Sequence, residues 1–137
     1  IEKEKDYFLN TGSPHYVVNV ESGLDQFDVV ASGKGIRYND RFKAEGTNVN
    51  FVEWNDEKLK IRTYERGVED ETLACGTGVT AAVLAMHDNG IVKNNFCDVK
   101  AMGGDLRVTF EKSELGYDNI WLQGPAKFVF KGVINIG

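Results

Sequence analysis

Residues 77–89 read TGVTAAVLAMHDN, and this stretch decides the fold that the sequence predicts. No charged side chain occurs from Thr77 to Met86, so a helix here is apolar nearly all round rather than along one stripe. Such a helix is normally buried on every side, and this one is too short to span a membrane. We therefore expect it to lie inside the protein, to end at Asn89-Gly90, and to carry His87 in a structural role in its last turn.

Strand-like runs make up most of the remaining chain. NFVEW (50–54) and KLKIRTYE (58–65) are predicted to pair across the turn-forming NDE at 55–57. Further β-branched or alternating runs are expected to be strands: 16–20, 96–101, 106–110, 119–124 and 126–136. Together with the buried helix, they predict an α+β domain in which a mostly antiparallel, barrel-like sheet wraps around a central helix.

A second helical segment is expected within residues 24–38, where apolar residues follow loosely helical spacing. The same segment contains Gly33 and Gly35, and glycine lowers helix stability. These two residues predict a break before Ile36.

Length and composition bound the class of protein. The 137 residues suffice for one domain with a real core, expected over 9–137 after a charged lead-in over 1–8. A net charge of −5 with scattered basic residues argues against nucleic acid as a partner, and no apolar run is long enough for a bilayer. The cysteines are Cys75 and Cys97 alone, which favours a reducing, cytoplasmic setting, although counting leaves a disulfide between them open.

Cys75 directly precedes the predicted helix. Unpaired N–H groups and the dipole at a helix start stabilise negative charge, and a thiol in such a position has a pKa below its free value of about 8.5. Gly76 and Gly78 allow a ligand to approach the backbone, and Thr77 adds a hydroxyl. The segment fits a reactive thiolate beside a bound carboxylate or phosphate, and a small buried residue at a tight turn is the alternative.

Polar residues elsewhere are candidates for the same site. Glu65 and Arg66 end a predicted strand, either as a solvated salt-bridge rim or as an acid/base and a guanidinium for a carboxylate. His15 follows a proline on a loop that enters a strand, where a histidine is either structural or functional. Asn48, ahead of an apolar strand, fits turn chemistry as well as a ligand contact, and the same two alternatives apply to Asn50. No metal site is expected, because no pair of Cys or His residues has the spacing of zinc ligands.

Four segments, taken in order, are more specific together than any one of them: GSPH (12–15), NVNF (48–51), RTYERG (62–67) and ETLACGTG (71–78). This combination resembles the C-terminal half of diaminopimelate epimerase, a cofactor-independent amino-acid epimerase. The resemblance runs from about Leu9 to Ile136. It implies two similar halves that face each other across a cleft, each with a sheet around a central helix and a cysteine at the helix start.

The resemblance also implies a reaction. One thiolate removes the α-proton of LL-diaminopimelate, and the thiol of the other half returns a proton to the opposite face, which gives the meso form. An α-proton is a very weak acid, so preorganised donors must stabilise the developing charge, and the amides of Gly76 and Thr77 are placed to do so. By the same resemblance Glu65 assists Cys75, and His15 assists the cysteine of the other half.

Recognition of the distal amino and carboxyl end falls, by resemblance, to Asn48 and Arg66. Ser13 stands where the family often has an asparagine before Pro-His, and segment 67–72 is one residue longer than usual. The amino-terminal half with the second catalytic cysteine is absent from this chain, since no glycine motif follows Cys97. We therefore expect the chain alone to be inactive, with the missing half as its partner and a homodimer as a further way to cover the cleft face.

Two other functions stay open at this point. One is a related isomerase of the same fold that acts on another small amino or carboxylic acid. The other is a stand-alone domain that binds carboxylates or a partner protein. The combination of ERG with ACGTG favours the epimerase over the related isomerase, whereas a Cys-Gly-Asn-Gly-like segment upstream in the parent gene would separate it from the stand-alone domain.

Overall fold

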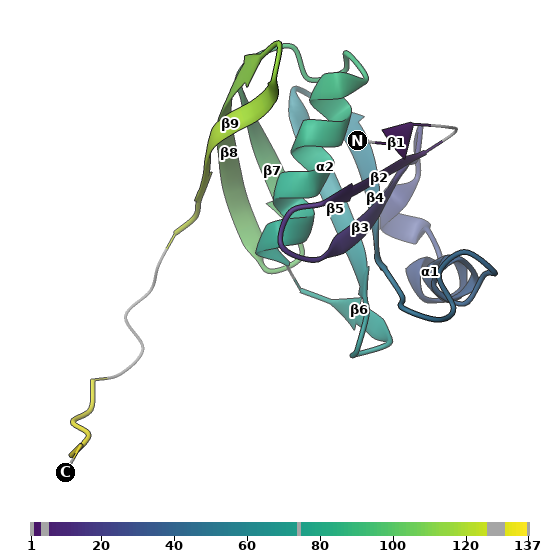
Figure 1. Cartoon of the computed structure of the whole chain (residues 1–137), viewed down its shortest axis with the longest axis horizontal. Coiled ribbons are helices and arrows are strands. Elements are labelled where there is room, and N and C mark those ends of the chain that lie inside the picture. The colour runs from purple at the N-terminus through teal and green to yellow at the C-terminus, as the bar shows by residue number, and fades with distance from the viewer. Residues whose placement is uncertain (1, 4–5, 74, 126–130, 137) are drawn as a thin grey trace.

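A curled sheet with a helix on each side forms the body of the protein (Figure 1). The computed structural model describes residues 2–3, 6–73, 75–125 and 131–136. Helix α2 (Gly76–Asp88) lies within the curl of the sheet, and helix α1 (Val29–Arg37) packs on the opposite side. The expected α+β fold, a curled sheet around a central helix, is confirmed.

The strands follow one another through the sheet in nearly sequential order. Their bounds are β1 (Glu2–Lys3), β2 (Tyr7–Asn10), β3 (Pro14–Asn19), β4 (Asn48–Asn55), β5 (Lys58–Glu65), β6 (Asp70–Thr72), β7 (Phe96–Ala101), β8 (Gly104–Ser113) and β9 (Gly116–Gln123). A short 3₁₀ turn, η1 (Leu24–Gln26), precedes α1. The spatial order is β1-β2-β3-β4-β5-β7-β8-β9, with β6 beside β5. Among the described strands, β3–β4 and β5–β7 are the parallel pairs and the other pairs are antiparallel.

Helix α2 is as buried as its composition predicts. Its buried residues run from Gly78 to Met86 with Thr80 half-buried among them. The helix contacts strands on both arms of the curled sheet, from β2 and β3 to β8 and β9. Small residues at 81, 82 and 85 let the strands approach closely, so the predicted central helix is confirmed. Among the described residues, no helix is long and apolar enough to cross a membrane.

Helix α1 continues through both of its glycines, so the break predicted before Ile36 is wrong. The helix begins after Asp28, whose Oδ1 accepts the N–H of Ala31 at 3.0 Å, and it ends at Arg37. A Cβ on Gly33 would lie 2.5 Å from Cβ of Tyr64 on β5. The glycine is therefore where α1 approaches the sheet, and this packing outweighs the low helix propensity of glycine.

The hairpin predicted across residues 55–57 is confirmed. Asn55 on β4 pairs with Lys58 on β5, and the two turn residues, Asp56 and Glu57, have φ values of 51° and 61°. Two positive φ values are typical of the turn whose twist matches that of the flanking strands.

Both ends of the chain differ from expectation. The lead-in expected over 1–8 is too long, because Tyr7 lies in β2 and is only 4% exposed, paired with Val17 of β3. Of the strand predicted over 126–136, residues 126–130 lie outside the described residues. Residues 131–136 form no strand and are exposed, away from the sheet (Figure 1). An alternating sequence forms a strand only where a partner strand supplies hydrogen bonds.

Candidate active site

The site is built on the side of the sheet that faces α2. Side chains alternate along each strand, and Val17, Val52 and Ile61 belong to the core under α2, whereas Val49 and Tyr64 pack with α1 on the opposite side. By the same alternation, three polar side chains share the α2 side with the first group: His15, Asn50 and Thr63. All three are buried. The sheet therefore brings polar groups from β3, β4 and β5 against the beginning of α2.

Cys75 is the N-cap of α2. Its backbone is extended, with φ −132° and ψ 112°, and its carbonyl accepts the N–H of Val79 at 2.8 Å as the first hydrogen bond of the helix. The thiol is half-buried, and Sγ lies 3.3 Å from Oγ1 of Thr77. Both cysteines are free, so the disulfide that counting left open is not formed.

Thr77 joins three of the residues that the sequence singled out. Its Oγ1 lies 2.8 Å from Nε2 of His15, 3.2 Å from Oγ of Ser13 and 3.3 Å from Sγ of Cys75. Its carbonyl also accepts the hydroxyl of Thr11 at 2.6 Å, which ties the turn before β3 to the helix. We call Ser13, His15, Thr77 and Cys75 the thiol cluster.

His15 is placed differently from its expected loop position. It lies inside β3, fully buried, with Nδ1 2.9 Å from Nδ2 of Asn50. Burial and, as the smaller cause, the nearby guanidinium of Arg66 together lower the pKa of His15 to about 4. The imidazole is therefore neutral near neutral pH.

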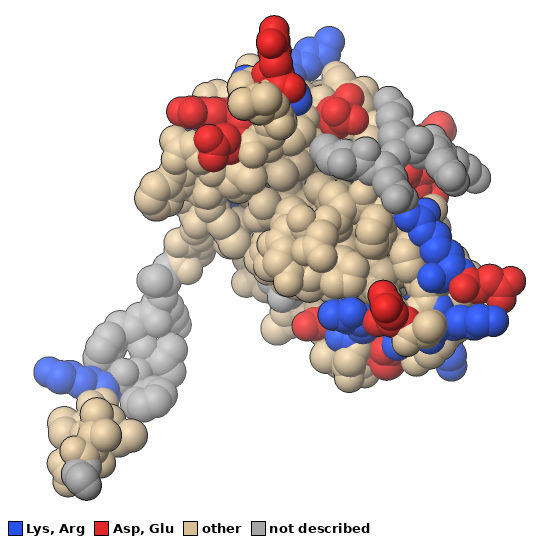
Figure 2. Space-filling model, in the orientation of Figure 1, with Lys and Arg blue, Asp and Glu red and all other residues tan. Residues whose placement is uncertain are grey.

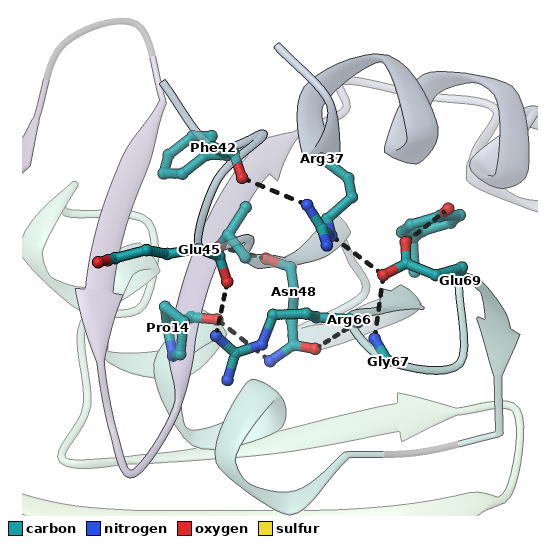
Figure 3. Close-up of polar contacts among 10 residues, drawn as sticks. Pro14, Arg37, Phe42, Glu45, Asn48, Arg66, Gly67 and Glu69 are labelled. Atoms are coloured by element: carbon teal, nitrogen blue, oxygen red, sulfur yellow. Dashed lines mark hydrogen bonds and ion pairs between the residues drawn. The ribbon is translucent and has the colours of Figure 1, made fainter. Parts of the chain in front are cut away.

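Asn48 ties the end of β5 to β3. Its Oδ1 accepts the backbone N–H of Arg66 at 2.8 Å, and its Nδ2 donates to the carbonyl of Pro14 at 3.1 Å (Figure 3). The same Nδ2 also donates to Oγ of Ser13 at 3.3 Å. The amide is only 4% exposed and its donors and acceptor are engaged within the protein. The structure thus gives Asn48 a scaffolding position between Arg66 and the thiol cluster.

Glu65 and Arg66 lie at the end of β5, outside the thiol cluster. Glu65 is half-buried, and Arg66 is exposed with Nη1 donating to the carbonyl of Glu45 at 3.0 Å (Figure 3). Beside Arg66 is a cavity of ≈ 520 Å³ that Phe8, Arg41 and Phe42 also line. Among the described residues, neither Glu65 nor Arg66 makes a hydrogen bond to the thiol of Cys75.

Gly76 is exposed at the start of α2 and lies under strand β9. A Cβ on Gly76 would be 3.0 Å from Cδ2 of Leu122. A groove of ≈ 520 Å³ runs alongside, lined by Thr80 and Leu84 of α2 together with Ile120 and Leu122 of β9. Figure 2 shows that the middle of this face, over α2 and the β2–β3 hairpin, is nearly free of charged side chains, which gather at its rim.

The sequence reasoning missed one buried member of the site, Thr63, and left Asn50 between turn chemistry and a ligand contact. Asn50 interrupts an apolar strand and Thr63 lies opposite it in register. A polar residue on the side of a buried strand that faces α2 is the signal that would identify both residues. The signal can be used only when it is known which side of the sheet each residue lies on.

The remaining cysteine and histidine are packed among other side chains outside the thiol cluster. Cys97 is buried in β7, and burial raises the pKa of its thiol to about 11. His87 packs against Phe110 and Tyr117, with Nδ1 2.8 Å from the hydroxyl of Tyr117. Among the described residues, no cluster of His, Cys, Asp and Glu is able to hold a metal ion.

The sequence of a known protein family matches most of this chain. The family model of diaminopimelate epimerase matches residues 7–129 of the chain. The chain belongs to the diaminopimelate epimerase family. The resemblance inferred from the four sequence segments is thereby confirmed, over nearly the same residues.

Family members from distant bacteria and an archaeon align along almost the entire chain. The chain is 48% identical to diaminopimelate epimerase of Flavobacterium psychrophilum over 128 residues, and 46% identical to that of Chlorobaculum tepidum over 132 residues. Identity to the enzyme of Archaeoglobus fulgidus is 42% over 134 residues. These alignments cover 93%, 95% and 98% of this chain but only 50%, 50% and 45% of the respective relatives. The chain therefore spans about half the length of the curated relatives it matches.

Solved structures support the fold. A phenazine biosynthesis protein from Enterococcus faecalis superposes with a TM-score of 0.58 at 20% identity, over 78% of this chain and 36% of that one. A second such protein, from Bacillus anthracis, gives a TM-score of 0.55 at 17% identity, over 78% of this chain and 33% of that one. At these identities the likeness shows the fold alone and nothing of the chemistry.

Proposed function

We propose that this chain is the carboxyl-terminal half of a cofactor-independent epimerase that converts LL-diaminopimelate into meso-diaminopimelate. The observation that carries the proposal is the position of Cys75, at the N-cap of α2 and hydrogen-bonded into the thiol cluster. Family membership supports the reaction type, and the coverage of about half of each relative supports a second half that faces this one.

The proposed mechanism uses two thiols on opposite faces of the substrate. In one direction the thiolate of Cys75 takes the α-proton while the thiol of the other half donates a proton to the opposite face. The charge that develops on the substrate spreads to its carboxylate, which the free amides of Gly76 and Thr77 are proposed to bind. Placing these donors on a rigid buried helix fixes them before the substrate arrives, which is what electrostatic catalysis requires.

The other residues act around this centre. Glu65 is proposed to assist proton transfer at Cys75, and Arg66, exposed beside its cavity, to bind the distal carboxylate. Asn48 is proposed to serve the same distal end, because its Oδ1 holds the backbone of Arg66. Ser13, which donates or accepts at Thr77, borders the substrate. We place the reaction in the cytoplasm, where thiols stay reduced.

A chimaera tests the proposal. The half of the Flavobacterium psychrophilum enzyme that this chain does not match is joined ahead of the chain, and interconversion of the two isomers is followed with α-proton exchange in D₂O. We expect epimerisation by the chimaera and none by the chain alone. Enzyme-like epimerisation by the chain alone would refute the need for a second half.

Matched cysteine variants assign the chemistry. Cys75→Ala in the chimaera should lower the rate by at least about 100-fold, the usual contribution of a general acid/base. Cys97→Ala is the control, since that thiol is buried in β7. A chimaera that keeps its activity after Cys75→Ala would exclude the proposed role of this thiol. Preferential turnover of another small amino acid would instead identify a related isomerase.

A further inference from the structure

A buried row of polar groups leads from β5 to the thiol of Cys75. Thr63 on β5 and Asn50 on β4 are register partners, and His15 follows on β3. These three residues are at most 3% exposed. Buried polar groups are costly unless each donor meets an acceptor, so their hydrogen bonds decide which atom carries each proton.

The amide of Asn50 selects the tautomer of His15. Its Oδ1 accepts the hydroxyl of Thr63 at 2.9 Å, and this orientation turns Nδ2 toward Nδ1 of His15, also at 2.9 Å. An amide nitrogen only donates, so Nδ1 must be the nitrogen without a proton. The neutral ring then carries its proton on Nε2.

The proton on Nε2 points at the hydroxyl that touches the thiol. Nε2 lies 2.8 Å from Oγ1 of Thr77 and 3.0 Å from Oγ of Ser13. A threonine hydroxyl has one proton and accepts two. When His15 and Ser13 donate to Oγ1 of Thr77, the proton of Thr77 is left for Sγ of Cys75 at 3.3 Å.

We propose that Asn50 and Thr63 are positioning residues that hold His15 as the Nε2–H tautomer, so that an ordered chain of donors ends on the sulfur of Cys75. The inference rests on the proposed function, in which Cys75 alternates between thiolate and thiol. A hydroxyl donor on the sulfur stabilises the thiolate, and the buried chain keeps that donor aimed without reorganisation.

The surroundings keep the ring neutral. A second proton on Nδ1 would face Nδ2 of Asn50, donor against donor. Among the titratable groups of the elements around His15, Arg66 approaches from the end of β5 and Cys75 from the start of α2. Tyr16 on β3 and Glu53 on β4 lie on the opposite side of the sheet from His15, because side chains alternate along each strand. There Glu53 accepts the N–H of Leu24.

The tautomer is measurable in the purified chain, independently of epimerase activity. The chain contains two histidines, so ¹⁵N-histidine labelling gives two ring systems, and His87→Gln assigns them. We expect long-range ¹H–¹⁵N correlations near neutral pH to show His15 with a proton on Nε2 and none on Nδ1. A proton on Nδ1, in either a neutral or a charged ring, would overturn the proposal.

Two valine variants separate positioning from mere packing. Thr63→Val removes the hydroxyl that orients Asn50, so we expect a second, Nδ1–H population of His15 to appear. Thr72→Val is the matched control, because Thr72 pairs with Thr63 in register and its buried hydroxyl has no hydrogen-bond partner among the described residues. If the folded Thr63→Val chain keeps the Nε2–H tautomer alone, Asn50 does not need Thr63 and the proposed chain is wrong.

The last hydrogen bond of the donor chain, from Thr77 to Cys75, is tested by the reactivity of the sulfur. The rate at which iodoacetamide modifies Cys75 is followed across a pH series by peptide mass spectrometry, which separates this thiol from Cys97. We expect Thr77→Val to slow the modification near neutral pH by about tenfold, the loss of one hydrogen bond to a charged group, and Thr77→Ser to restore it. An unchanged rate in Thr77→Val would overturn the donor chain, whereas the chimaera decides the proposed function separately.

Discussion

At Gly78 the first turn of α2 lies directly against the buried polar groups. A Cβ there would be 2.6 Å from Oδ1 of Asn50 and 3.1 Å from Cε1 of His15. The absence of a side chain therefore allows the helix to approach β3 and β4 closely enough for Thr77 to reach His15. This is a packing requirement of the helix interior, separate from the flexibility that glycine gives a turn.

Gly78→Ala should lower the free energy of unfolding by about 1–3 kcal/mol, because one extra carbon overfills a packed contact. Denaturation in urea measures the change. Gly35→Ala is the control: it lies in α1 with nothing within 4 Å of an added Cβ, so helix propensity should raise stability by up to about 1 kcal/mol. A Gly78→Ala chain as stable as the unchanged protein would contradict this account of the contact.

His15 links stability to pH. Its pKa is about 4 in the folded protein against an ordinary value of 6.5, so between these values the unfolded chain binds a proton that the folded one does not. The stability that the neutral His15 contributes is complete above its pKa in the unfolded chain. It is lost as the pH falls through its pKa in the folded protein, and it amounts to about 3 kcal/mol. We expect urea denaturation to show a shallower fall of stability on acidification in His15→Gln. Parallel pH profiles would contradict the buried neutral imidazole.

At the level of elements, Arg62 of β5 connects strand β6 and the η1 turn to its own strand. Its Nε and Nη2 each lie 2.7 Å from the carboxylate of Glu71 on β6, and its Nη1 donates to the carbonyls of Leu24 and Phe27 at 2.8 Å and 2.9 Å. Strand β6 leads toward Cys75, so this guanidinium holds the segment that delivers the thiol.

Arg62→Lys should destabilise the protein by about 1–3 kcal/mol, because lysine cannot form the fork or reach both carbonyls. Hydrogen exchange at the amides of β6 should accelerate with it. Arg107→Lys is the control: Arg107 makes the same kind of fork with Asp98, but both side chains are well exposed, at 47% and 39%. A solvent-exposed pair contributes at most about 1 kcal/mol, so equal effects of the two variants would refute the argument.

For the whole molecule, we propose that the weakly charged face around α2 is where a second half docks. The groove between α2 and β9 opens on it, and Leu122 there is 42% exposed next to Gly76. A weakly charged, partly apolar face beside the thiol that we propose to be catalytic fits an interface that closes over the proposed substrate.

Leu122→Glu should weaken binding of the missing half by at least about tenfold, because it places a charge in a buried contact. Leu115→Glu is the control, since Leu115 is 100% exposed at the tip of the β8–β9 hairpin. Light scattering of the mixed halves measures the complex. A mass that rises from 15.3 kDa toward twice that value in the chain alone would show a second copy on the face instead.

Local sequence patterns predicted most of the helices and strands. They did not predict where tertiary packing overrides local preference. The apolar helix, the β4–β5 hairpin and strand β7 follow from side chains whose preferences agree with their surroundings. The break in α1 was predicted wrongly because the sequence does not show that Gly33 meets Tyr64. The strand over 126–136 failed within its described part because a strand needs a partner that sequence alternation does not supply.

The sequence by itself determined the family of the protein and the buried helix that begins beside Cys75. An uncharged helix preceded by Cys-Gly-Thr-Gly must be buried and must present its free amides beside the thiol. Only the tertiary structure decided that His15 is buried and neutral, and that it reaches the thiol through Thr77. The physical reason is that hydrogen bonds between Thr63, Asn50 and His15 depend on strand register and on which side of the sheet each residue faces, and both are set only when β3, β4 and β5 pair around α2.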